Sequence, residues 1–170
     1  MQAEERIEVG LSAKMYRKDV FLEIRCPMLA FGEDLWIFPA LMERCKKIST
    51  VDWLVYYYQR SNSIVHTVNE SSTKDRLEAM LNMARYLLSH GFVDGATKWF
   101  EYSIGIAWPL RNRAEVAQQF TRYFDKAEEK QLAVNWNMKT RIQYASINSQ
   151  FFYNVLQIGN RVAKTLKMKK

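Results

Sequence analysis

Helical periodicity after residue 70 constrains the fold of this chain more than any other feature of its sequence. Ser72, followed by Asp75 three residues later, predicts a helix start, and Gly91 predicts the cap at its end. Apolar residues between them recur at intervals of three and four: Leu77, Met80, Leu81, Ala84, Leu87 and Leu88. This spacing predicts one helix with a single buried face.

Three further helices are predicted beyond Gly91. Asp94 starts the first, which ends before Pro109. Asn112 and Glu115 start the second, with Val116, Phe120, Tyr123 and Phe124 on its buried side. The third is a long helix from about residue 139 to residue 166. Its inward positions are Ile142, Ala145, Phe152, Val155, Leu156 and Val162. We therefore expect residues 71–170 to form a unit of about four helices.

Residues 1–70 mix helix and strand signals. A strand is predicted over residues 8–17, a short helix over 18–24, and a longer helix over about 34–46 with Pro39 inside it. Residues 47–51 and 53–60 are rich in β-branched and aromatic side chains, as strands are. The chain is therefore predicted to be α+β but mainly α, with one domain over residues 1–70 and a helical one over 71–170.

Composition places the chain among globular proteins, because 48% of its residues are hydrophobic and 14% are aromatic. Charges or amides interrupt every apolar run before it reaches the length of a membrane span. The opening residues, MQAEERIEV, contain acids and no apolar core, so we expect no signal peptide. Cys26 and Cys45 are far apart and are interpreted as reduced thiols of a cytosolic protein.

The net charge of +7 is concentrated at the C-terminal end. The last ten residues, RVAKTLKMKK, carry five Lys and Arg and no acid. A basic end of this kind could contact anionic lipid headgroups at a membrane surface, or a nucleic acid. It could equally be a solvated, frayed helix end.

Four short motifs follow one another in the first half of the chain. They are K-M-Y-R-K-D-V-F at 14–21, F-G-E-D-L at 31–35, R-C-K-K-I at 44–48 and V-Y-Y-Y-Q-R-S-N-S-I at 55–64. Their order and spacing resemble the C-terminal part of bacterial family 2 glycosyltransferases, which are inverting enzymes of the GT-A fold. The resemblance covers roughly residues 9–66. It implies a partial GT-A-like α/β segment followed by a helical extension.

The resemblance also implies roles for individual residues. Asp34 would be the general base, which takes the proton of the acceptor hydroxyl as its oxygen attacks the anomeric carbon, and Glu33 would be its neighbour in the site. Residues near the donor diphosphate would be Tyr58, Gln59, Arg60 and Ser63. Arg60 could offset the charge on the departing nucleotide. His66 would be a metal ligand.

The implied reaction needs a nucleotide-sugar donor, a glycan or lipid-linked acceptor and, in the complete enzyme, Mg²⁺ or Mn²⁺. The family's donor-binding motifs, including D-x-D, are not found in residues 1–30. We therefore expect this chain to be the acceptor side of such an enzyme, inactive by itself and binding no metal alone. The expected location is the cytoplasm, with peripheral contact at the inner membrane.

Simpler interpretations of the same residues stay open. Two acids are favoured at any helix start, so Glu33 and Asp34 need no catalytic role. Arg60 could be a surface charge and His66 an ordinary polar residue. An alternative function is a non-enzymatic helical binding or scaffold module with a basic tail, whose partner would be a protein, RNA or a membrane surface. No RNA-recognition motif is found, so we expect no nucleic-acid partner. The helical extension could also form homo-oligomers.

Overall fold

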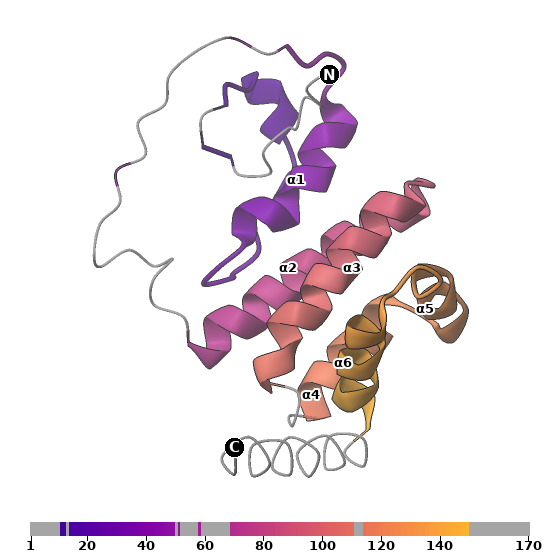
Figure 1. The fold of residues 1–170 in the computed structure, drawn as a ribbon. Coiled ribbons are helices and arrows are strands. Elements are labelled where there is room, and N and C mark those ends of the chain that lie inside the picture. The colour runs from indigo at the N-terminus through magenta and orange to yellow at the C-terminus, as the bar shows by residue number, and fades with distance from the viewer. Residues whose placement is uncertain are drawn as a thin grey trace, which may run out of the picture. The chain divides into compact units, whose positions relative to one another are not determined.

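A computed structural model describes residues 11, 12, 14–49, 51, 58, 69–110 and 114–149 of the chain. These residues form six α-helices and two short 3-10 helices, and they contain no strand (Figure 1). The α-helices are α1 (Glu33–Arg44), α2 (Glu70–Ser89), α3 (Val93–Ala107), α4 (Ala114–Tyr123), α5 (Lys126–Leu132) and α6 (Met138–Asn148). The 3-10 helices are η1 (Lys18–Phe21) and η3 (Trp108–Leu110). The prediction of a mainly helical chain is confirmed.

The strands predicted in the first half are not seen where the structure describes their residues. Residues 14–17, 47–49 and 51 are irregular. Strand-forming side chains make a strand only when a second strand is available for pairing, and the described residues include none. The rest of these segments, including residues 53–60 apart from Tyr58, lies outside the described residues.

The chain divides into two compact units, Met1–Ala79 and Met80–Lys170, with the boundary inside α2. In the first unit, α1 begins one residue before its predicted start and buries Ile37, Phe38 and Leu41. Pro39 lies in the interior of α1 and is itself buried. Proline has no N–H for the carbonyl four residues earlier, so the burial of this face must offset a missing helical hydrogen bond.

Helix α2 has well-defined caps at both ends. At its start, the Asn69 side chain accepts from the Ser72 N–H (2.8 Å), and the Ser72 hydroxyl accepts from the Asn69 N–H (3.0 Å). The prediction that Ser72 itself is the cap is therefore wrong by three residues, because Asn69 caps equally well. At its end, the N–H groups of Gly91 and Phe92 donate to the carbonyls of Leu88 and Leu87. This pair of bonds is the Schellman motif, and it confirms the predicted Gly91 cap.

The core of the second unit is an aromatic cluster around α3. Helix α3 contacts α5 and α6, and α4 contacts α6 (Figure 1). The cluster comprises Phe100, Phe120, Phe124, Trp136 and Tyr144. The predicted burial of Val116, Phe120 and Phe124 is confirmed, whereas Tyr123 is only half-buried. Ring pairs of this kind add edge-to-face attraction to the burial of their apolar area.

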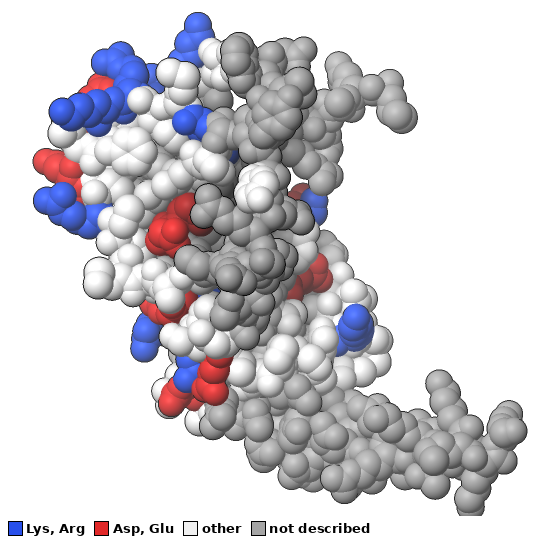
Figure 2. All heavy atoms as spheres, turned by 90° about the vertical axis from the view of Figure 1, so that its left-hand side faces the viewer, with Lys and Arg blue, Asp and Glu red and all other residues white. Residues whose placement is uncertain are grey.

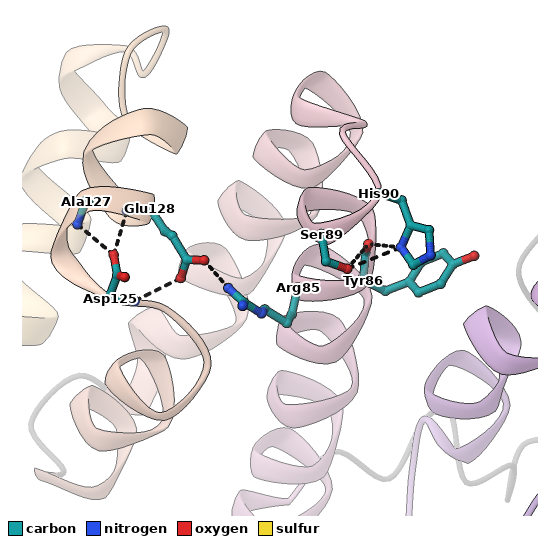
Figure 3. A network of polar contacts seen from close by, with 7 residues as sticks. All are labelled: Arg85, Tyr86, Ser89, His90, Asp125, Ala127 and Glu128. Atoms are coloured by element: carbon teal, nitrogen blue, oxygen red, sulfur yellow. Dashed lines mark hydrogen bonds and ion pairs between the residues drawn. The ribbon is translucent and has the colours of Figure 1, made fainter.

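Helix α5, which the apolar spacing did not predict, starts with a complete capping box. The Asp125 side chain accepts from the N–H groups of Ala127 (2.8 Å) and Glu128 (2.9 Å), while Glu128 accepts from the Asp125 N–H (3.1 Å). Figure 3 shows Arg85 reaching from α2 to the same Glu128 carboxylate. The cap thereby also fixes α5 against the second part of α2.

Helix α6 starts where the Asn137 side chain accepts from the Thr140 N–H (2.9 Å). The predicted helix over 139–166 is thus confirmed up to Asn148, and the part beyond residue 149 lies outside the described residues. Ile142 was expected to face inward but is 39% exposed, while Ile147 is buried. None of the described helices is both long enough and apolar enough to cross a membrane.

Candidate functional site

The strongest sequence candidate, Gly32-Glu33-Asp34, forms the entry to α1 and is called the GED turn below. Gly32 has a left-handed backbone (φ 90°), and its carbonyl accepts from the Trp36 N–H (2.9 Å). Glu33 and Asp34 are consequently the first two residues of the helix. Glu33 is exposed and Asp34 is half-buried. Both carboxylates therefore lie at the positive end of the helix dipole, which attracts anionic groups.

Close packing against α2 explains why glycine occupies the turn. A Cβ on residue 32 would lie 3.1 Å from the Ala79 Cβ and 3.7 Å from the Arg76 Cα. The left-handed conformation is itself unfavourable for residues with a Cβ. Both the backbone angle and the neighbouring helix thus select glycine at this position.

Two charged residues of α2 hold the loop that precedes the turn. The Ala30 N–H donates to Asp75 Oδ2 (2.8 Å), and the Arg76 guanidinium lies 5.5 Å from the centre of the Phe31 ring. The second contact is a cation–π interaction. Asp75, which the sequence suggested as part of the α2 cap, instead binds a backbone 45 residues away. No local pattern signals such a contact, so neither Asp75 nor Arg76 could be assigned to the site from the sequence.

The two oxygens of Asp34 have different environments. Oδ1 accepts from the Leu35 N–H (2.7 Å). Within the described part of the chain, Oδ2 accepts no hydrogen bond and touches no cation. A carboxylate with one oxygen held and the other open is oriented and can accept a hydrogen bond from an incoming hydroxyl.

Of the other sequence candidates, the structure describes one. Tyr58 is described and is 82% exposed. Gln59, Arg60, Ser63 and His66 lie outside the described residues. Among the side chains that the structure does describe, no three His, Cys, Asp or Glu come together to hold a metal ion. The roles of these five residues stay predictions.

Substitution of Gly32 by alanine is expected to lower the free energy of unfolding by about 2 kcal/mol, because the left-handed backbone costs about 1–2 kcal/mol and Ala79 must also move. Gly91→Ala is the matched control: its φ is 79°, but a Cβ there meets no atom within 4 Å. That variant should lose only about 1 kcal/mol. Denaturant unfolding followed by circular dichroism measures both. Equal losses would show that the contact with Ala79 is unimportant.

A shallow pocket of about 640 Å³ lies in the Met80–Lys170 unit and is lined in part by Phe124, Glu129, Tyr144 and Asn148. The Tyr144 hydroxyl donates to Glu129 Oε1 (2.5 Å), and the Asn148 amide donates to the Tyr144 carbonyl (3.1 Å). Burial and, after it, the Glu129 carboxylate raise the pKa of the Tyr144 phenol well above its ordinary value of 10.0. The hydroxyl is thus kept protonated and serves the packing of α6 on α5.

The raised pKa predicts a loss of stability at high pH. The folded state keeps the Tyr144 proton while the unfolded state releases it, so this contribution is complete below about pH 10 and declines as the pH rises further. Tyr144→Phe should be about 1 kcal/mol less stable near neutral pH, because Glu129 loses its donor. The difference between the two proteins should shrink between about pH 9 and about pH 11. Urea unfolding at both pH values tests this, and a constant difference would contradict it.

Comparison of the chain with protein-family models, with curated proteins and with solved structures found no match.

Proposed function

We propose that this chain supplies the acceptor side of an inverting glycosyl transfer, with Asp34 as its general base. The observation that carries the proposal is the geometry of the GED turn. The Asp34 carboxylate has one anchored and one open oxygen at the start of α1, and Asp75 and Arg76 of α2 hold the loop that leads into this helix. A site that must position a proton acceptor to within a fraction of an ångström needs support of this kind.

The proposed step is a single displacement. Asp34 Oδ2 takes the proton of an acceptor hydroxyl while the hydroxyl oxygen forms a bond to the anomeric carbon of the donor sugar. The bond from that carbon to the diphosphate breaks on the opposite face, and its electron pair leaves with the nucleotide. The configuration at the carbon is therefore inverted. Glu33 is the neighbouring acid and is exposed. In the proposed step it accepts a hydrogen bond from a second hydroxyl of the acceptor.

Of the residues that the resemblance puts near the donor diphosphate, only Tyr58 is among those described. A nucleotide-sugar is the proposed donor, and a glycan or a lipid-linked sugar is the proposed acceptor. The resemblance implies Mg²⁺ or Mn²⁺ in the complete enzyme, and among the described residues no three His, Cys, Asp or Glu come together. The proposed location is the cytoplasmic side of the inner membrane.

The test is an activity assay on the complete product of the reading frame that contains these 170 residues. It is incubated with nucleotide-sugars and with glycans and lipids extracted from the cell envelope, and nucleotide release is measured. Acceptor-dependent release by the complete product, but not by residues 1–170 alone, is the expected result. Failure of the complete product to consume any nucleotide-sugar in the presence of these acceptors would overturn the proposal.

A further inference from the structure

Two segments of the first unit, residues 14–25 and 43–48, lie side by side. Arg44 at the end of α1 forms an ion pair with Glu23 (3.6 Å), and α1 contacts η1 (Figure 1). The Cys45 thiol is close enough to Tyr16 to influence the pKa of its phenol, which is raised first by burial and then by Cys45. The two segments therefore adjoin, and their exposed side chains together are called the basic–apolar surface below.

Positive charge dominates this surface. The two segments contain seven Lys and Arg but three Asp and Glu, an excess of four positive charges. Two of the acids pair with neighbouring arginines, Asp19 with Arg17 (3.0 Å) and Glu23 with Arg44. Lys18, Arg25, Lys46 and Lys47 are all exposed. Figure 2 shows Lys and Arg side chains gathered at the upper end of the face that it displays, the end at which Figure 1 draws η1 and the end of α1.

Large apolar side chains stand among these charges. Met15 is fully exposed, Leu22 is 61% exposed and Ile48 is 51% exposed. Single exposed apolar residues are common on soluble proteins, but here they come from both adjoining segments, and Met15 and Ile48 each follow a lysine. In water, the exposed apolar side chains are not stabilised. At the boundary between lipid headgroups and acyl chains, both the apolar and the basic side chains find favourable surroundings.

We propose that the basic–apolar surface binds an anionic lipid bilayer. Leu22 and Ile48 enter the boundary between headgroups and acyl chains, and Lys46 and Lys47 contact headgroup phosphates. A nucleic acid would match the charge, but single-stranded binding also uses aromatic platforms for bases, and the most exposed apolar side chains here are aliphatic. The proposal concerns residues separate from the basic C-terminal run and does not depend on the role of Asp34.

The test is flotation of the chain with vesicles of phosphatidylcholine alone and of phosphatidylcholine mixed with phosphatidylglycerol. Binding is expected only to the mixed vesicles. Lys46→Ser combined with Lys47→Ser should weaken it about 25-fold, because each basic residue near an anionic surface contributes a factor of about five. Leu22→Ser combined with Ile48→Ser should weaken it at least about tenfold.

Matched controls use side chains of the same kind in the second unit. Lys126→Ser with Lys130→Ser, and Val134→Ser with Met138→Ser, change exposed residues outside the basic–apolar surface and should leave flotation unchanged. A fifth protein carries Lys169→Ser and Lys170→Ser. Flotation that disappears in this protein but persists in the Lys46 and Leu22 variants would overturn the proposal, as would equal binding to pure phosphatidylcholine. Binding of RNA in a gel-shift assay without any vesicle binding would also overturn it.

Discussion

Asp34→Asn is expected to lower the rate of sugar transfer by the complete gene product about 100- to 10,000-fold, the usual contribution of a positioned general base. Asparagine has nearly the same shape as aspartate, and its amide oxygen can still accept the Leu35 N–H that Asp34 Oδ1 accepts. The GED turn should therefore stay folded while the open atom loses its ability to take a proton. Initial rates of acceptor-dependent nucleotide release, together with denaturant unfolding of both proteins, measure the two effects separately.

Glu33→Gln is the matched control, because it removes the same charge from the adjacent and more exposed residue. We expect a much smaller loss of rate, expressed mainly as a higher KM for the acceptor, since Glu33 is proposed to bind a hydroxyl and not to remove its proton. Full activity in Asp34→Asn would exclude Asp34 as the base. Equal losses in the two variants would mean that the charge of the GED turn matters and not the identity of one carboxylate.

Features that depend on neighbouring residues were predictable from the sequence. The apolar spacing along α2 and the glycine at its end depend on residues within five positions of one another. The Gly91 cap is confirmed, and the predicted face is buried over residues 77–84 but half-buried at Leu87 and Leu88. Helix α5 has seven residues, too few for its apolar spacing to stand out. Its signal was the pair Asp125 and Glu128 three residues apart, which forms the capping box.

Features that depend on distant contacts were not predictable. Ala30 and Asp75 are 45 residues apart, and the Cβ of Ala79 approaches Gly32 only because α2 packs against the GED turn. The start of α6 shows a milder form of the same difficulty. Two neighbouring choices of the apolar face fit the sequence of α6 almost equally well. The predicted choice has Ile142 inward, whereas in the structure Ile142 is exposed and Ile147 is buried.

The candidate site was predicted in part. The position of Asp34 at a helix start follows from two acids after a glycine, which local preferences favour, and the structure has this arrangement. The residues expected near a diphosphate lie in or just after a segment that is predicted to be a strand. A strand forms only where a second strand pairs with it, and the sequence of the segment does not say which one does. Gln59, Arg60, Ser63 and His66 lie outside the described residues, so the sequence remains their sole support.

Phe100→Ala is expected to lower the free energy of unfolding of the second unit by about 3–5 kcal/mol, the range for removing a large buried side chain. Phe100 is fully buried, and its ring centre lies 5.0 Å from that of Phe124 and 5.3 Å from that of Phe120. It also stacks on Trp136 at 5.4 Å. Since rings from α4 and its end, from Trp136 and from Tyr144 of α6 all meet on this one side chain, the cavity left by alanine cannot close by a local shift.

Phe92→Ala supplies the control for this prediction. The Phe92 ring is 61% exposed, so its removal deletes the same atoms without opening a cavity. Its N–H, which completes the cap of α2, is unchanged by the substitution. We expect a loss of no more than about 0.5 kcal/mol. Denaturant unfolding followed by tryptophan fluorescence measures both variants, and a similar loss in the two would mean that the aromatic cluster does not hold the second unit together. The expected result, a much larger loss in Phe100→Ala than in Phe92→Ala, would mean that α3, α4 and α6 depend for their stability on the same ring contacts.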